Sequence, residues 1–289
     1  WMCRASMKYD PTSVELLVEE EEVRNYRYYD AWSEQGRSCL LWGIDQASRN
    51  KTADDETPIK RAKIETVYKN SGGLPVMVVV SNALSEEEAL VLRQLSMCTR
   101  MDDPNNLQHR PFYDSDDNIK GGNDVVFLGG YLQLLTPGIA ARVQEVTKMA
   151  WEHVGWKDIL KESGEEEYQD PALCGIRTSE HLSYDNWGGL GPHADSGSLY
   201  TTLIALSSPS DYDGGEFYIY PNSDDEVFST EERIGIRPER LSALIFLSEK
   251  SHGVEDIYSE GREMFATEHW KHGDSFIGTK RPRASDLLE

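Results

Sequence analysis

The chain has 289 residues, of which 38% are hydrophobic and 28% charged, and its formal net charge at pH 7 is −22. This length allows one large domain or a domain with an appendage, and the apolar content excludes a wholly disordered chain. The negative charge repels phosphate backbones and argues against a nucleic-acid partner. No apolar run approaches the roughly 18 residues of a membrane span. The sequence therefore predicts a soluble, acidic protein without a membrane span.

Three segments are expected along the chain. Residues 1–73 form an N-terminal extension of unknown role, residues 74–275 the main domain, and residues 276–289 a C-terminal tail. Because the sequence begins with Trp1, we expect the natural N-terminus to lie upstream, so a cleaved signal peptide stays possible. The four cysteines are scattered and form no C-x-x-C pair. The compartment is therefore left open between the cytoplasm and the lumen of the secretory pathway.

Two helices are predicted in the first half of the main domain. Ser85-Glu86-Glu87-Glu88 is a capping box, and leucines at helical spacing carry the helix to about Met97. Thr136-Pro137 starts the second helix, because proline is tolerated in the first turn. The expected buried stripe of the second helix consists of Ile139, Val143, Val146, Met149 and Ala150. Between the helices, residues 102–130 are interpreted as a polar, glycine-containing loop that could serve as a substrate lid.

Short β-rich segments dominate the chain after about residue 172, and one more precedes the first helix at Leu74–Val80. The predicted strands lie near Gly175–Tyr184, Pro192–Asp195, Leu199–Leu206, Glu216–Tyr220, Ile234–Arg237, Leu241–Leu247, Gly253–Tyr258 and Arg262–Trp270. Many short strands at this spacing indicate a sandwich or barrel, one face of which the helices would cover. The predicted fold class is mainly β with supporting helices, around a jelly-roll core.

Two histidines and one aspartate are candidate metal ligands. His193 and Asp195 are two positions apart, so on a strand both side chains leave from the same face. His252 follows the apolar segment Leu241–Leu247. Two imidazoles and one carboxylate that leave coordination positions open form the ligand set of non-haem Fe(II) oxygenases. Taken alone, this pattern also fits unrelated surface histidines.

Additional motifs surround these three residues. Tyr184 stands nine positions before His193, and a glycine-rich turn separates the two. Asp213–Phe217 reads Asp-Gly-Gly-Glu-Phe, and Arg262 stands ten positions after His252. With these motifs the sequence resembles the 2-oxoglutarate- and Fe(II)-dependent dioxygenases, and among them the prolyl 4-hydroxylase-like branch. The fold that this resemblance implies is the double-stranded β-helix, a cupin-like jelly roll.

The resemblance implies roles for five residues. His193, Asp195 and His252 would bind Fe(II), and no catalytic residue beyond these ligands is implied. Arg262 would hold the distal carboxylate of 2-oxoglutarate, for which its planar guanidinium is suited. Tyr184 would donate a hydrogen bond to the same cosubstrate. Dioxygen would be the second cosubstrate, and ascorbate the reductant.

The implied activity is hydroxylation of an aliphatic carbon by a dioxygenase domain spanning residues 74–275. A prolyl residue of a peptide or protein is the first substrate hypothesis. One alternative is a small-molecule hydroxylase that acts on an amino acid or a lipid-derived acid. The other is a jelly-roll binding module without catalysis.

Some residues near the motifs allow a second interpretation. Arg262 could be a surface ion-pair residue, and Tyr184 a core tyrosine with a satisfied hydroxyl group. His181 has the opposite strand parity to Tyr184, so we expect it to point away from the cavity. The tryptophan that the family has after its cosubstrate cation is displaced by two positions to Trp270, which predicts a bulge in the last strand.

Overall fold

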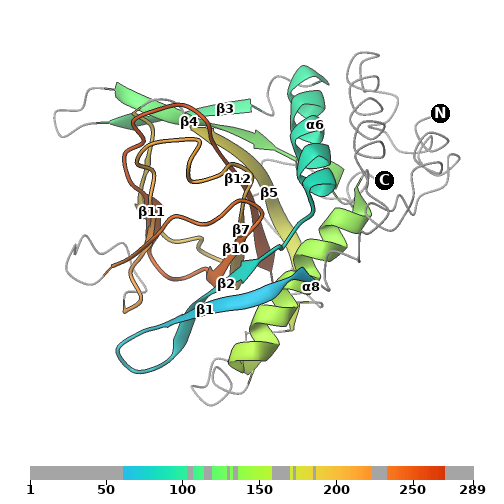
Figure 1. Ribbon diagram of the computed structural model, residues 1–289, viewed down its shortest axis with the longest axis vertical. Helices are drawn as coiled ribbons and strands as arrows, with labels where there is room; N and C mark the ends of the chain where they lie inside the picture. Colours follow the sequence, from blue (N-terminus) through green and yellow to red (C-terminus); the bar gives the residue numbers. More distant parts are fainter. Residues whose placement is uncertain are drawn as a thin grey trace, which may run out of the picture.

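Two antiparallel β-sheets and the helices α6 and α8 make up most of the described part of the computed structural model (Figure 1). The structure describes residues 61–102, 107–113, 119–128, 131–132, 136–157, 170–171, 174–184, 187–222 and 233–270. Its elements in chain order are β1 (Lys63–Lys69), β2 (Pro75–Ser81), α6 (Glu86–Asp102), β3 (Leu107–Tyr113), β4 (Ile119–Phe127), α8 (Pro137–Val154), β5 (Gly175–Tyr184), β6 (Leu190–His193), β7 (Tyr200–Ala205), β8 (Phe217–Ile219), β9 (Ile234–Ile236), β10 (Ala243–Leu247), β11 (His252–Val254) and β12 (Arg262–Trp270).

The order of the strands defines a double-stranded β-helix. The large sheet has eight strands in the order β1-β2-β10-β7-β12-β5-β4-β3, and the small sheet has four in the order β6-β11-β8-β9. From β5 to β12 the chain alternates between the sheets, except that β8 and β9 follow each other within the small one. The four strands of the small sheet therefore lie opposite β10, β7, β12 and β5. The predicted fold class, mainly β with supporting helices around a jelly roll, is confirmed.

The eight strands predicted after residue 172 are all present. The first and the last have the predicted bounds, Gly175–Tyr184 and Arg262–Trp270. The second lies at Leu190–His193, slightly before the predicted segment, so Asp195 follows the strand and does not belong to it. The pairing of β12 with β5 shifts register between Glu268 and His269. The extra residue at this point is Arg177 of β5, whereas β12 pairs with β7 without a shift, so the bulge predicted for the last strand is wrong.

Both predicted helices form, and their ends follow the sequence signals. The backbone amide of Ser85 donates to the Glu88 carboxylate at 2.8 Å, and the amide of Glu88 donates to the Ser85 hydroxyl at 3.2 Å. This reciprocal pair is the predicted capping box. Helix α8 begins at Pro137 and ends at Val154, and Gly155 after it adopts the left-handed conformation, with φ of 69°, that favours glycine.

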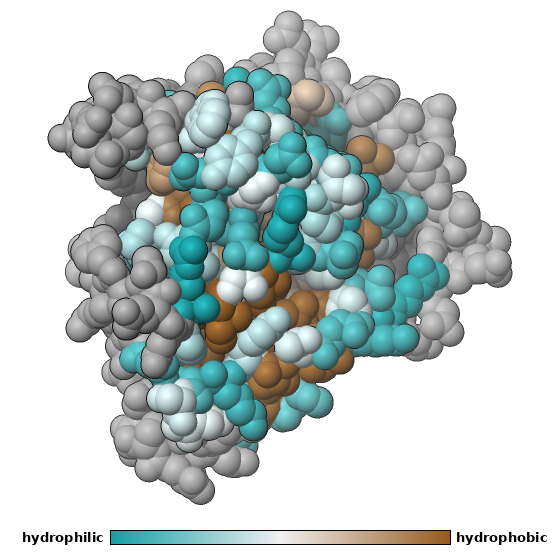
Figure 2. Space-filling view, turned by 60° about the vertical axis from the view of Figure 1, so that its left-hand side comes forward, coloured by the Kyte–Doolittle hydropathy of each residue, from teal (hydrophilic) through white to brown (hydrophobic). Residues whose placement is uncertain are grey.

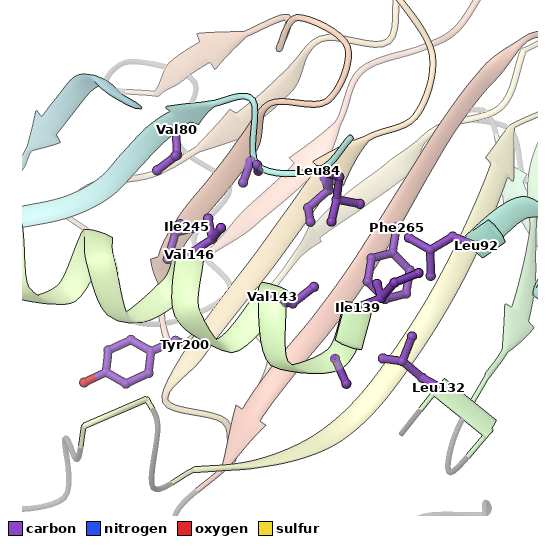
Figure 3. Packing of buried hydrophobic residues seen from close by; sticks show 14 of the residues in the cluster. Val80, Leu84, Leu92, Leu132, Ile139, Val143, Val146, Tyr200, Ile245 and Phe265 are labelled. Atoms are coloured by element: carbon purple, nitrogen blue, oxygen red, sulfur yellow. The ribbon is translucent and has the colours of Figure 1, made fainter. Parts of the chain in front are cut away.

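The main hydrophobic core lies between these two helices and the outer face of the large sheet (Figure 3). Val143 and Val146 of α8 point toward Ile245 of β10, and Leu92 of α6 lies beside Phe265 of β12 (Figure 3). All five side chains are fully buried. Burial of such a side chain contributes about 1.5–3 kcal/mol. The helices thus hold the large sheet from outside and leave its inner face to the second sheet.

Residues 102–130 do not form the predicted loop. Helix α6 extends to Asp102, and β3 and β4 form an antiparallel pair that continues the large sheet beyond β5. The prediction was wrong because β3 lacks an alternating apolar pattern and contains Pro111. Proline is tolerated on an edge strand, and β3 is the last strand of the sheet, so the partner strand rather than local propensity decides this structure.

Strand β1 lies within the predicted N-terminal extension and yet pairs with β2 of the main domain. We therefore propose that the domain begins at or before Lys63, whereas residues 1–60 and 276–289 lie outside the described residues.

No helix of the described part is both long and apolar enough to cross a membrane. Figure 2 shows one face of the molecule, on which hydrophilic residues surround a band of hydrophobic ones.

Candidate metal and cosubstrate site

A cavity of about 190 Å³ lies between the two sheets. Because side chains alternate along a strand, every second residue of β5 and β12 faces it. The residues from these two strands are Thr178, Glu180, Leu182, Tyr184, Arg262, Met264, Ala266 and Glu268. The small sheet, the segment after β6, and strands β3 and β7 complete the lining with Arg110, Leu190, His193, Asp195, Thr201, Leu203, Phe217, His252, Gly253 and Val254.

The three predicted metal ligands meet in this cavity. His193 at the end of β6 pairs across the small sheet with His252 at the start of β11, and their ring centroids are 4.4 Å apart. The Asp195 carboxylate lies 3.8 Å from Nε2 of His193 and 3.6 Å from Nε2 of His252. One ligand atom from each residue lies within 4.8 Å of the other two. This donor set, two imidazoles and one carboxylate, fits Fe(II).

Hydrogen bonds fix the orientation of the three side chains. Nδ1 of His193 lies 2.9 Å from the carbonyl of Gly191, and Nδ1 of His252 lies 2.9 Å from that of Lys250. When Nδ1 donates its proton to a carbonyl, Nε2 keeps the lone pair that a metal needs. Burial lowers the pKa of His252 to about 4, with the nearby His193 adding to the effect and Asp195 opposing it. His252 is therefore neutral at pH 7, in its metal-binding form.

Arg262 is buried at the other end of the cavity, with an exposed fraction of 1%. Its Nε donates to the carbonyl of Gly215 at 3.1 Å, whereas neither Nη1 nor Nη2 has a hydrogen-bond partner. A Cβ atom at Gly215 would lie 2.9 Å from Cδ of Arg262, so glycine makes room for the arginine. A buried guanidinium with two open nitrogens is costly unless an anion pairs with it. This contradicts the interpretation of Arg262 as a surface ion-pair residue.

Tyr184 lies beside Arg262. The two residues are directly opposite in the pairing of β5 and β12, and the guanidinium carbon is 4.5 Å from the centre of the Tyr184 ring. The tyrosine is buried and lines the cavity. Its predicted hydrogen bond to a cosubstrate stays a prediction, but its position next to the open guanidinium is the one that such a role requires.

Two glutamates in the cavity were missed in the sequence. Glu180 of β5 and Glu268 of β12 face the metal ligands, and burial is the main cause that raises the pKa of each carboxyl group, to about 7 for Glu268. Strand parity could have found them, because they are separated by even numbers of positions from Tyr184 and Arg262, respectively. The sequence does not reveal, however, how far along each strand the cavity extends.

The other histidines of the described part lie outside the cavity. His181 of β5 and His269 of β12 point to the opposite side of the sheet and are buried, as strand parity predicts for His181. Burial lowers the pKa of each to about 4. His109 lies 3.0 Å from the carboxylate of Asp124 on the neighbouring strand. His272 lies outside the described residues.

The comparison with protein families supports the same class of site. Residues 180–272 match the 2OG-Fe(II) oxygenase superfamily. This segment contains the three candidate ligands and Arg262 and belongs to that superfamily, so the recognition from the sequence is confirmed. The family name implies Fe(II), 2-oxoglutarate and dioxygen. No curated protein matches the chain.

Among solved structures, the chain is similar to several oxygenases at low identity. An oxidoreductase of the 2OG-Fe(II) oxygenase family from Burkholderia pseudomallei is 14% identical, with a TM-score of 0.44 over 68% of this chain and 86% of that one. A prolyl hydroxylase from Trichoplax adhaerens, in complex with a peptide fragment of hypoxia inducible factor, is 14% identical, with a TM-score of 0.43 over 68% and 83%. An alpha ketoglutarate dependent carbocyclase from nogalamycin biosynthesis is 13% identical, with a TM-score of 0.43 over 73% and 90%. The fold assignment rests on the strand order of this chain.

Proposed function

We propose that this protein is a 2-oxoglutarate- and Fe(II)-dependent dioxygenase that hydroxylates an aliphatic carbon. In this proposal His193, Asp195 and His252 hold Fe(II), Arg262 binds the distal carboxylate of 2-oxoglutarate, and Tyr184 hydrogen-bonds the same cosubstrate. The observation that carries the proposal is one cavity that contains both the facing His-Asp-His group and a buried guanidinium with two open nitrogens.

The residues present fit the proposed groups. Bound Fe(II), together with 2-oxoglutarate and dioxygen, supplies the oxidant for an unactivated C–H bond, with oxidative decarboxylation of the 2-oxoglutarate to succinate. The carbonyls of Gly191 and Lys250 hold both imidazoles with Nε2 toward the metal position, and the Thr201 hydroxyl donates to Asp195 at 2.5 Å. The protein thus contributes preorganised ligands.

The middle of the cavity is apolar. Leu182 and Met264 are directly opposite each other on β5 and β12, and Phe217 and Val254 approach from the small sheet. All four side chains are nearly or completely buried. Such a lining excludes bulk water from the reacting centre, which strengthens the pairing of Arg262 with a carboxylate and protects reactive species from side reactions.

For the substrate, a prolyl residue of a peptide or protein remains the first hypothesis, which the motif spacings of the prolyl 4-hydroxylase-like branch support. A small-molecule substrate, an amino acid or a lipid-derived acid, is the second candidate. The cavity of about 190 Å³ favours a small reacting group beside the cosubstrate in either case. Ascorbate as reductant belongs to the same proposal.

The experiment that tests the proposal is turnover of 2-oxoglutarate to succinate by the purified full chain with Fe(II) and ascorbate. We expect slow succinate production without added substrate, and its loss in His193→Ala and in Arg262→Ala. His109→Ala is the matched control, because this half-exposed histidine pairs with Asp124 outside the cavity.

The outcomes separate the enzyme from the binding module. Succinate production that depends on His193 and Arg262 supports the dioxygenase and justifies a screen of proline-containing peptides, with hydroxylation read by mass. A folded chain that binds neither Fe(II) nor 2-oxoglutarate contradicts the proposal and favours the non-catalytic jelly-roll module.

A further inference from the structure

The wall formed by β5 and β12 changes in character along the cavity. Four residue pairs lie directly opposite each other across these strands: Tyr184 with Arg262, Leu182 with Met264, Glu180 with Ala266, and Thr178 with Glu268. All eight residues line the cavity. The wall is therefore cationic at the Arg262 end, apolar in the middle, and acidic at the Glu268 end. Because the cosubstrate is assigned to the cationic end, the acidic end is left for a second molecule.

The two glutamates at the acidic end each keep one oxygen toward the cavity. The recorded bonds of Glu180 go to Oε1 alone, from Nη2 of Arg110 at 3.5 Å and from the Thr178 hydroxyl at 3.4 Å. Those of Glu268 go to Oε2 alone, from Nη1 of Arg177 at 3.2 Å and from the Ser198 hydroxyl at 2.5 Å. Neither remaining oxygen is among the buried polar atoms that lack a partner, and both side chains line the cavity. Arg110 and Arg177 thus form an ion pair with one oxygen of each carboxylate, and Arg110 lines the cavity as well. The other oxygen of each carboxylate is the one that a ligand would meet.

A separate observation indicates that this cavity is shaped for ligands. Arg262 is 1% exposed and lines the cavity, yet both of its Nη atoms lack a partner. Asn123 of β4 is also 1% exposed, and neither polar atom of its side chain has a partner. Asn123 lies directly opposite both Tyr184 and Arg110, which line the cavity, and so belongs to the same face of the sheet. Unpartnered polar side chains inside a folded protein are rare, and in the proposed function the cosubstrate would pair with Arg262 at this end of the cavity.

The acidic end also lies close to the metal ligands. The Asp195 charge acts on both Glu180 and Glu268, and it raises the pKa of each carboxyl group, after burial. Glu268 further occupies the position at which the family resemblance leads us to expect a tryptophan, since that residue is displaced by two positions to Trp270.

We infer that the substrate of this site carries a cationic nitrogen group, an alkylammonium or a guanidinium, that binds Glu268 and Glu180 close to the carbon that is hydroxylated. The inference rests on the proposed function and specifies its substrate class. A cationic donor matches two open carboxylate oxygens, because charge-assisted hydrogen bonds are the strong ones.

The test compares pairs of small molecules that differ in this charge. The charged members are L-lysine, L-arginine and L-proline. Each neutral partner lacks one cationic group of its charged member: L-norleucine lacks the side-chain ammonium, L-citrulline the guanidinium, and N-acetyl-L-proline the ring ammonium. Each is added to the full chain with Fe(II), 2-oxoglutarate and ascorbate, and both succinate and hydroxylated product are measured. N-acetylated, C-amidated lysine and arginine form a further arm, because they distinguish a basic residue within a peptide from a free amino acid.

We expect at least one charged molecule to stimulate succinate formation at least tenfold more than its neutral partner. In Glu268→Gln and in Glu180→Gln this ratio should fall toward one, whereas Glu255→Gln, which removes an ion-paired glutamate outside the cavity, should leave the ratio unchanged. The ratio within one variant is independent of how much of that variant folds or binds metal.

Other results overturn the inference. If no charged molecule is preferred over its neutral partner in the unsubstituted protein, or if the preference survives both glutamate substitutions, the acidic end does not select a cation. If succinate is still produced without added substrate in such a case, only this inference fails and the proposed function stands. Where that background production and 2-oxoglutarate binding are both absent, the dioxygenase proposal itself fails.

Discussion

The two faces of strands β5 and β12 carry buried polar groups with opposite consequences. On the inner face, Arg262 has two nitrogens without a partner, and they face a cavity. On the outer face, Nε2 of His181 and Nδ1 of His269 also lack a partner, but these atoms lie on the side that packs against the helices. An unpartnered atom beside a cavity indicates a ligand, whereas the same deficit in a packed core is a cost of about 1–3 kcal/mol. Because side chains alternate along a strand, one residue of β5 or β12 faces the cavity and the next faces the packed core.

The largest effect should come from the inner face. Asp195→Ala removes the carboxylate that lies within 3.8 Å of Nε2 of both His193 and His252. We expect bound Fe(II) in the anaerobically reconstituted chain, measured by elemental analysis after desalting, to fall more than about tenfold, since a ligand should matter at least as much as the outer-shell groups whose loss costs about 10–100-fold. The same loss in His109→Ala would contradict the site, because His109 lies outside the cavity.

The second prediction concerns packing on the outer face. Phe265 of β12 is fully buried in the core beneath the helices, and its neighbours Met264 and Ala266 line the cavity. Phe265→Ala should lower the free energy of unfolding by about 3–5 kcal/mol, because it leaves a cavity in a close-packed core. Urea unfolding measures the change, and Phe265→Leu, which keeps most of the volume, should cost clearly less.

The folded fraction of Phe265→Ala in the absence of urea provides a control for the comparison of the two faces. This fraction should still bind 2-oxoglutarate, since Phe265 points away from Arg262 and the cavity. Loss of binding in proportion to the folded chain would show that the two faces are not independent.

The residues of the candidate metal group and Arg262 could be picked out because they belong to the motifs that carry the family resemblance, and their roles stay a prediction. His193 and Asp195 are two positions apart, and Arg262 begins a strand whose apolar pattern is clear. The acidic end was not predictable in this way. Glu180 and Glu268 become neighbours only through the pairing of β5 with β12, which joins residues more than 80 positions apart. Strand parity gives the face of each residue, but only the assembled sheets show where the cavity ends.

The same distinction explains which parts of the fold were missed. The eight strands of the jelly roll are framed by turn residues, and each has enough apolar or β-branched residues to be recognised. β1 and β3 are the two edge strands of the large sheet, and each has only one neighbour. Their sequences, KIETVYK and LQHRPFY, carry little alternation, so their structure depends on the strand that they pair with. Strand β4 was missed as well, although it has two neighbours, because its sequence IKGGNDVVF contains two glycines and little alternation. The strands of the jelly roll are thus encoded locally, whereas β1, β3 and β4 depend on the strands that they pair with.

The third prediction tests whether the open nitrogens of Arg262 serve a ligand rather than the fold. Arg262→Met removes the buried charge and keeps much of the side-chain volume. The thermal stability of the ligand-free chain should change little or rise, because an unpaired buried charge is destabilising. The wild-type chain with Fe(II) should gain about 2.7 kcal/mol when 2-oxoglutarate is present at 100 times its Kd, and the variant should lose this gain.

Differential scanning fluorimetry with and without 2-oxoglutarate measures both effects in one experiment. Arg233→Met is the matched control, because Arg233 pairs with Glu255 at the surface and not in the cavity. A large drop in the stability of ligand-free Arg262→Met would show instead that the arginine holds the fold together.

The last prediction concerns the response of the two outer histidines to acid. Burial lowers the pKa of His181 and of His269 to about 4, from an ordinary value of 6.5, so the unfolded chain binds more protons than the folded one between these pH values. Stability from these groups is therefore present above pH 6.5 and is lost as the pH falls toward 4, by about 1.4 kcal/mol per pH unit for each histidine. The raised pKa of Glu268 gives the opposite slope, since its contribution to stability falls as the pH rises toward 7.

His181→Gln should reduce the acid slope of the urea-unfolding free energy by one histidine's share and leave succinate production at pH 7 unchanged. An unchanged slope would mean that the His181 imidazole is not kept neutral by the core, and the contrast between the two faces would then rest on Arg262 alone.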